Sequence, residues 1–126
     1  MNLIKNVADF HQQILKMEPQ PCALLDERGT YERSGFMQEE LDEFIDSMVA
    51  NNLVGAADAL ADLVYVALGT AYMMGLPFQD IWDAVQKANM TKVAGTTKRG
   101  MRIDAMKPAG WVGPEAEIER LIQDAQ

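Results

Sequence analysis

The sequence predicts an all-α protein, an antiparallel bundle of four main helices followed by a short C-terminal helix. Apolar residues recur at spacings of three and four along most of the chain, which is the period of amphipathic helices. Proline and glycine fall between segments of helical length. One segment, residues 53–74, is apolar or small around nearly its whole circumference, which is typical of a helix in the middle of a bundle.

The first half of the chain is predicted to hold one helix and a long connector. Apolar residues at helical spacing indicate a helix over residues 2–17, and Pro19 ends it. Residues 18–34 are then expected to form a connector, with Gly29 and Ser34 as further helix breakers.

The remaining helices follow from the same spacing. A second helix is predicted at 35–51, and the short turn after it makes an antiparallel hairpin with the central helix at 53–74. A fourth helix is predicted at 78–93 and a terminal one at 114–124.

Length and composition limit the class of protein. The 126 residues suit a single domain spanning 1–126, with its core at 36–93 and a basic loop and tail at 94–126. The net charge of -8 disfavours nucleic acid as a partner. A single cysteine excludes an internal disulfide and fits a cytoplasmic location. Two acids in the apolar segment argue against a membrane span.

One face of the central helix carries a polar and aromatic stripe. Its members follow spacings of four, three, four and three: Asp58, Asp62, Tyr65, Gly69 and Tyr72. Burying two carboxylates costs several kcal/mol unless they are paired or bound to metal. A cation is therefore expected against this stripe.

A second pair of carboxylates lies on the preceding helix. Glu40 and Glu43 are three apart and share a face, and Glu40 borders the apolar stripe of its helix. Helix-dipole interactions of solvated acids are one interpretation. The other is that this pair meets Asp58 and Asp62 around a hard divalent cation, for which Mg²⁺ is the natural candidate.

Basic and polar residues gather after the fourth helix begins to leave the core. Asn89 and Lys92 continue its apolar stripe, so they either emerge into solvent or reach a cavity beside the carboxylates. Between residues 87 and 107 lie six of the eleven basic residues, Lys98 and Arg99 among them. On an acidic protein this favours an anionic ligand such as phosphate, with a solvated loop as the alternative.

The acids, Mg²⁺ and the basic segment together indicate hydrolysis of a phosphate ester or anhydride. His11 is the only histidine, which disfavours di-iron, zinc and serine-histidine-aspartate chemistry. It is interpreted either as a partly exposed polar residue or as the wall of a ligand pocket.

Three motifs resemble the all-α nucleoside triphosphate pyrophosphohydrolases, the MazG-like and phosphoribosyl-ATP pyrophosphohydrolase-like proteins. They are EELDE at 39–43, DALADLVYVALGTAYMMGLP at 58–77 and NMTK at 89–92. The chain departs from the family pattern at Ala59, where a glutamate precedes the motif aspartate by three residues, and Asp58 is placed to substitute for it.

The resemblance implies a reaction: cleavage of a nucleoside triphosphate between its α- and β-phosphates, with Mg²⁺ or Mn²⁺. It implies an intertwined homodimer or homotetramer in the cytoplasm, or in the host cytoplasm if the chain is encoded by a phage. A non-catalytic, nucleotide-binding helical dimer is the alternative. The implied metal ligands are Glu40, Glu43, Asp58 and Asp62, and Glu39 is the residue implied to activate water. The implied substrate-binding residues are Asn89, Lys92, Tyr65, Lys98, Arg99 and His11.

Overall fold

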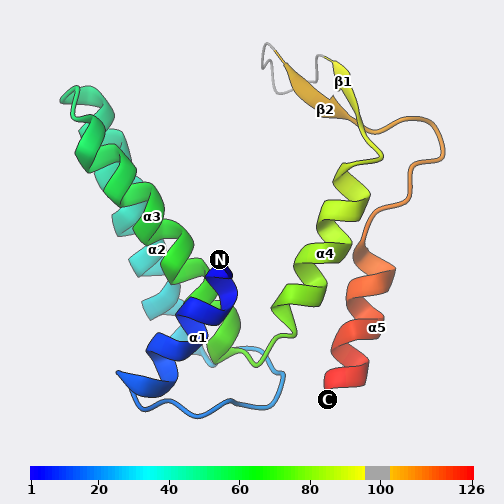
Figure 1. Ribbon diagram of the computed structural model, residues 1–126, viewed down its shortest axis with the longest axis horizontal. Coiled ribbons are helices and arrows are strands. Elements are labelled where there is room, and N and C mark those ends of the chain that lie inside the picture. The colour runs from blue at the N-terminus through cyan, green and yellow to red at the C-terminus, as the bar shows by residue number, and fades with distance from the viewer. Residues whose placement is uncertain (96–102) are drawn as a thin grey trace. The chain divides into compact units, whose positions relative to one another are not determined.

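The protein is mostly helical, as the sequence predicts (Figure 1). The computed structural model describes residues 1–95 and 103–126. The chain forms two compact units, Met1–Leu76 and Pro77–Gln126. The first unit contains three helices, and the described residues of the second form two helices and a small two-stranded sheet.

Helix α1 (Leu3–Gln13) is shorter than the predicted helix at 2–17. Lys16 adopts a left-handed conformation with a φ of 58°. This conformation lets the Met17 amide donate to the carbonyl of His11 at 2.9 Å, which closes the last turn of the helix. The chain therefore leaves the helix before the prolines are reached.

Helix α2 (Glu27–Val49) begins eight residues before the predicted start at 35, so that prediction was wrong. The side chain of Asp26 caps it by accepting a hydrogen bond from the Gly29 amide at 2.7 Å. Gly29 thus lies in the first turn, and the Ser34 hydroxyl bonds to a carbonyl within the helix. Neither residue breaks the helix, so residues 27–34 of the predicted connector belong to α2.

Helix α3 (Leu53–Met73) matches the predicted central helix closely. Asn51 makes the turn in a left-handed conformation, with a φ of 56°. The Asn52 side chain then caps α3 by accepting from the Gly55 amide at 3.0 Å. Helices α2 and α3 are in contact along the hairpin that this short turn creates, as Figure 1 shows.

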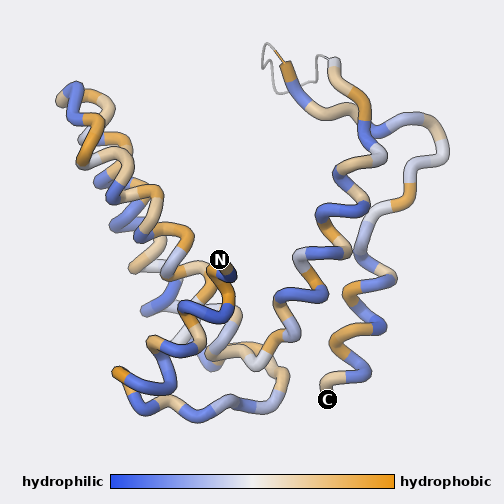
Figure 2. Tube along the Cα trace, viewed as in Figure 1, coloured by the Kyte–Doolittle hydropathy of each residue, from blue (hydrophilic) through white to orange (hydrophobic). Residues whose placement is uncertain are grey.

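The core of the first unit consists mainly of small residues on α3. Its buried members are Val7, His11, Cys22, Ala56, Ala59, Gly69 and Ala71. Alanine and glycine at the interface allow the helices to approach closely. The larger apolar side chains of α2 and α3 are left partly or largely exposed, and Figure 2 shows how apolar α3 is along its length. By length and composition α3 could also cross a membrane, although it carries Asp58 and Asp62.

The connector after α1 packs against the end of α3. Ala23 donates its amide to the carbonyl of Met74 at 3.0 Å. Gly75 has a φ of +65°, and a Cβ there would lie 2.7 Å from the backbone of Pro21 and would collide with the carbonyl oxygen of Gln20. Glycine at this position therefore allows two segments distant in sequence to meet.

The second unit begins with α4 (Phe78–Asn89), which ends four residues before the predicted limit of 93. The chain then enters a two-stranded antiparallel sheet, β1 (Val93–Gly95) and β2 (Asp104–Met106), in which Val93 pairs with Met106. The sequence analysis missed this hairpin, because strands of three residues are too short to show a clear alternation.

Helix α5 (Glu115–Ala125) closes the second unit and agrees with the predicted terminal helix. It packs against α4. Ile118, Leu121 and Ile122 are its half-buried apolar residues, at the spacing expected for one helical face. Figure 2 shows the alternation of apolar and polar residues along α5.

Candidate active site

The α2–α3 hairpin brings the two predicted pairs of carboxylates together. Glu40 and Glu43 lie on α2, and Asp58 and Asp62 lie on α3. Glu40 and Asp62 are half-buried, whereas Glu43 and Asp58 are exposed. The antiparallel pairing places the start of α3 beside the end of α2, so the two motifs face each other.

The acids of the two helices interact electrostatically at Glu40. Burial raises this pKa above the ordinary value of 4.5, and the charge of Glu43 raises it further, as does a hydrogen bond between the two carboxyl groups. Asp62 and then Asp58 raise it across the helix pair. The charges of the other three acids therefore all act on Glu40, whose carboxyl group holds its proton more strongly than an ordinary glutamate does.

The Oε2 atom of Glu40 lacks a donor. Among the described residues it is buried and has no hydrogen-bond partner. When Glu40 and Glu43 are both ionised, neither carboxylate has a proton to donate to the other. The described residues also form no ion pair with either acid. A buried carboxylate oxygen in this state fits a metal cation, which would replace the missing donor.

The metal ligands are not preassembled. Within residues 1–95 and 103–126, no three His, Cys, Asp or Glu side chains lie close enough together to hold a metal ion. Asp58 is exposed, and a change of its rotamer toward Glu40, Glu43 and Asp62 would complete an all-oxygen donor set.

Glu39, the residue implied to activate water, is placed differently. It lies one position before Glu40, about 100° around the helix. It is exposed and lines a shallow depression of about 430 Å³ on α2, together with Tyr31 and Phe36. Its charge is not among those that raise the pKa of Glu40. The structure therefore does not bring Glu39 into the cluster of four acids.

The aromatic end of the stripe on α3 is covered by α1. The rings of Phe10 and Tyr65 meet edge to face with centroids 5.6 Å apart, and those of His11 and Tyr72 are 5.1 Å apart. His11 is only 3% exposed, and its Nδ1 lies 2.8 Å from the carbonyl oxygen of Val7. His11 thus packs between two helices, and Tyr65 keeps one exposed side.

Arg33 is a residue that the sequence analysis missed. Its guanidinium reaches from α2 to α3, where Nε donates to the Thr70 hydroxyl and a terminal nitrogen donates to the Val66 carbonyl, both at 3.0 Å. Burial lowers its pKa. The guanidinium lies against Gly69, so a cation does contact the stripe, although away from the carboxylates. The sequence did contain a signal for Arg33. It lies seven residues before Glu40, and this spacing places both side chains on one face of α2.

The remaining predicted substrate-binding residues belong to the second unit. Asn89 is the exposed last residue of α4, and its carbonyl accepts a hydrogen bond from the Lys92 amide at 3.1 Å. The ammonium group of Lys92 lies over the ring of Trp111. Lys98 and Arg99 lie outside the described residues.

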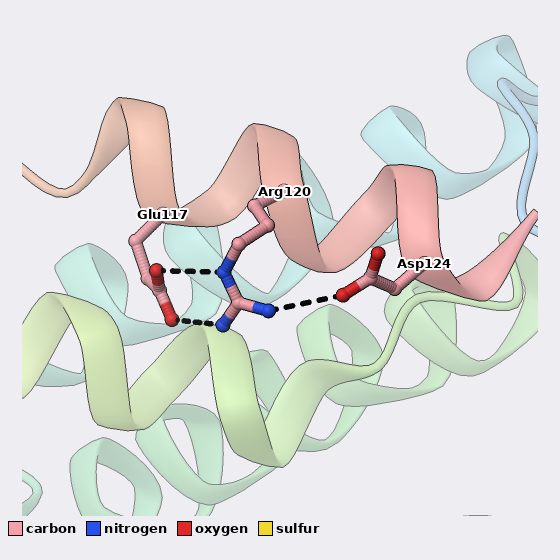
Figure 3. Close-up of polar contacts among 3 residues, drawn as sticks. All are labelled: Glu117, Arg120 and Asp124. Atoms are coloured by element: carbon pink, nitrogen blue, oxygen red, sulfur yellow. Dashed lines mark hydrogen bonds and ion pairs between the residues drawn. The ribbon is translucent and has the colours of Figure 1, made fainter.

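The second unit also has an open groove between α4 and α5. Its volume is about 690 Å³, and Lys87, Thr91 and Arg120 are among its polar lining. Arg120 binds Glu117 through two nitrogens and Asp124 through a third, at 2.6 to 3.1 Å (Figure 3). The guanidinium is therefore already paired within α5.

These features define a class of protein: helical chains in which paired carboxylates on two antiparallel helices form one acidic centre. Comparison with family models narrows the class. The model for phosphoribosyl-ATP pyrophosphohydrolase matches residues 7–89, well over half of the chain, so the chain belongs to the phosphoribosyl-ATP pyrophosphohydrolase family.

This membership confirms the resemblance drawn from the motifs and gives the activity class, a pyrophosphohydrolase acting on nucleotides. The matched segment contains all four acids of the cluster and ends before Lys92. No curated protein matches the chain significantly.

Proposed function

We propose that the protein is a metal-dependent nucleoside triphosphate pyrophosphohydrolase, which releases a nucleoside monophosphate and pyrophosphate. The observation that carries this proposal is the buried, donorless oxygen of Glu40, with Glu43, Asp62 and Asp58 close enough to raise its pKa. A site that holds negative charge at such cost is suited to a divalent cation and a polyphosphate.

Glu40, Glu43, Asp58 and Asp62 would hold Mg²⁺ or Mn²⁺. A bound divalent ion supplies charge neutralisation for the phosphates and lowers the pKa of water. In the proposed reaction, the water oxygen bonds to the α-phosphorus. The bond between the α-phosphorus and the oxygen that bridges to the β-phosphate breaks, and pyrophosphate leaves. The motif implies Glu39 as the acceptor of the water proton. Because Glu39 lies outside the cluster of four acids, full turnover in Glu39→Gln would show that another group accepts this proton.

Substrate contacts are also proposed for single residues. Tyr65 would contact the nucleoside through its exposed side, and the buried His11 would belong to the wall of the same pocket. Asn89, Lys92, Lys98 and Arg99 would contact the sugar and phosphates. The preferred base is a matter for experiment, with dUTP, dCTP and dGTP as candidates. Phosphoribosyl-ATP joins them because the matching family carries its name.

One observation favours a second candidate, a non-catalytic nucleotide-binding protein of the same fold. Ala59 occupies the position at which the related motif has a glutamate, and Asp58, its proposed substitute, is exposed. Loss of one ligand would weaken metal binding while leaving nucleotide contacts in place.

A panel of nucleoside triphosphates and phosphoribosyl-ATP, with Mg²⁺ or Mn²⁺, separates these candidates through pyrophosphate release. We expect turnover of at least one substrate and its loss in Glu43→Gln. Asp42→Asn is the matched control, because Asp42 is an exposed acid on the same helix that already bonds to Gln38. Substrate binding without any pyrophosphate release would favour the non-catalytic candidate.

A homodimer or homotetramer is proposed as the working form. Large apolar side chains at helical spacing on α2 and α3 are 41% to 59% exposed: Leu41, Ile45, Met48, Leu60 and Val64. Exposed apolar surface of this kind is typical of a face that another chain covers. Light scattering should give a multiple of the 14.0 kDa chain mass, and Ile45→Lys should lower it. We also propose a cytoplasmic location.

A further inference from the structure

Arg33 links the two helices that carry the acids. From α2, its Nε atom donates to the Thr70 hydroxyl and a terminal nitrogen donates to the Val66 carbonyl, both at 3.0 Å. The Thr70 hydroxyl donates to the same carbonyl at 2.7 Å, so the three groups form one closed network. In residues 1–95 and 103–126, no other side-chain hydrogen bond or ion pair joins α2 to α3.

The packing of α2 against α3 does little to fix how the two helices are rotated. No residue of α2 is fully buried, and the buried residues of α3 are three alanines and one glycine. Close interlocking of side chains is what normally selects a single arrangement of a core. Because the buried residues are small, little interlocking opposes a rotation of α2 about its own axis.

The acids act against the arrangement that the site needs. Burial raises the pKa of Glu40, and the charges of Glu43, Asp62 and Asp58 raise it further, which means that the ionised acids repel one another across the helix pair. In the metal-free protein this repulsion favours a rotation that turns Glu40 away from Asp62. The contacts of Arg33 with α3 oppose that rotation.

The network of Arg33 lies on the same face of the hairpin as the acids. On α2, Arg33 precedes Glu40 by seven residues, which is about two turns and roughly 10 Å along the axis. On α3, Val66 and Thr70 follow Asp62 by four and eight residues. Antiparallel helices require such opposite steps, so Arg33 holds the face of α2 that presents Glu40 toward the face of α3 that presents Asp62.

We propose that Arg33 is a positioning residue of the acidic centre, which keeps Glu40 facing Asp62 by fixing the rotation of α2 against α3. A guanidinium suits this role because its rigid fork of donors bonds to two acceptors at once, whereas a lysine ammonium is a point charge on a flexible stem. In this role Arg33 acts through the acids and is not itself a ligand. That the acids so placed bind a divalent ion rests on the proposed function.

Binding of Mn²⁺ to the full chain without nucleotide tests this role, with the EPR signal of the free ion as the measurement. Arg33→Gln and Arg33→Lys should each weaken the affinity by about tenfold, the lower end of the cost of losing an outer partner of a metal site. The sign is informative, because removing a positive charge roughly 10 Å from the acids would by itself strengthen the binding of a cation.

Arg28→Gln is the matched control for the loss of an arginine. Arg28 is exposed on α2 and is paired with Glu32 of the same helix at 2.8 Å, so its loss should change the Mn²⁺ affinity by less than about twofold. Circular dichroism checks that every variant is folded under the conditions of the assay.

A second control separates positioning from a loss of stability. Val7 on α1 is 2% exposed, so Val7→Ala should destabilise the first unit. Its side chain takes no part in the hydrogen bonds between α2 and α3, so the Mn²⁺ affinity should stay within about twofold of the wild type. Urea unfolding compares the stabilities of the variants. The proposal is overturned if Arg33→Gln binds Mn²⁺ as tightly as the wild type, or if Val7→Ala weakens binding as much as Arg33→Gln.

The outcomes also distinguish this inference from the proposed function. A Mn²⁺ affinity that depends on Arg33, in a protein that releases no pyrophosphate, would support the positioning role and contradict the pyrophosphohydrolase activity. Normal pyrophosphate release with an unchanged Mn²⁺ affinity in Arg33→Gln would do the reverse. A wild-type protein that binds no Mn²⁺ would overturn both.

Discussion

Replacing Gly69 by alanine should reveal how tightly α1 is seated on the central helix. A Cβ at this position would lie 2.7 Å from Cε1 of His11 and 2.9 Å from both Nε2 of His11 and a terminal nitrogen of Arg33. The Arg33 nitrogen could move aside only by giving up its hydrogen bond to the Val66 carbonyl. The His11 ring is 3% exposed and bonded to the Val7 carbonyl, so it has no free space in which to retreat.

Two opposing terms set the magnitude. Overpacking of this kind costs about 1–3 kcal/mol. Replacing glycine by alanine within a helix stabilises the helix by about 1 kcal/mol. We therefore expect Gly69→Ala to lower the free energy of unfolding by up to about 2 kcal/mol. Gly35→Ala is the matched control, because nothing lies within 4 Å of the added Cβ on α2, and it should stabilise the protein.

Urea unfolding followed by circular dichroism measures both variants, and a double-mutant cycle assigns the cause. In a His11→Ala background the ring is absent, so Gly69→Ala should become neutral or stabilising. A coupling free energy of at least about 1 kcal/mol between the two positions is expected. If Gly69→Ala has the same effect in both backgrounds, a clash with the His11 ring is not the reason for its cost, and the prediction is wrong.

Three further predictions follow from the site and its supports. Since the pKa of Glu40 is raised above 4.5, its ionisation lowers stability as the pH rises past that value, so Glu40→Gln should raise the metal-free melting temperature at neutral pH. The same variant should lose the stabilisation by Mg²⁺ that the wild type shows in thermal unfolding, and retention of it would contradict the metal assignment. Gly75→Ala should cost about 2–4 kcal/mol in urea unfolding, because it combines a left-handed φ with a clash against Pro21. Trp111→Phe removes the indole donor that ties Trp111 to the Ala88 carbonyl and the Thr91 hydroxyl, and it should destabilise the second unit, visible as faster proteolysis between α4 and α5.

The acidic centre was predictable because its residues follow helical spacing on two helices joined by a short turn. Once α2 and α3 pair, Glu40 and Asp62 have little freedom in where they face. Glu39 was harder to place, since a one-residue step on a helix turns the side chain through about 100°. Its motif position did not reveal that it lines a separate depression.

The start of α2 was missed for a local reason. Gly29 and Ser34 resemble helix breakers, but the Asp26 side chain caps the helix and places Gly29 in the first turn, where glycine is tolerated. The signal for this start, an Asp followed by an acid in the first turn, was present in the sequence. This signal places the start of α2 at Glu27.

The sequence by itself determined the helical class, the bounds of the central helix and the facing of its carboxylates, because these depend on spacing within one element. Only the tertiary structure decided that His11 and Arg33 meet at Gly69, and that Lys92 and Lys107 share Trp111. Those contacts join residues far apart in the chain, and their geometry depends on which side chains are small enough to let helices and hairpin approach. The spacing of apolar residues shows which face of a helix is buried, but the fit of the side chains determines which element packs against that face.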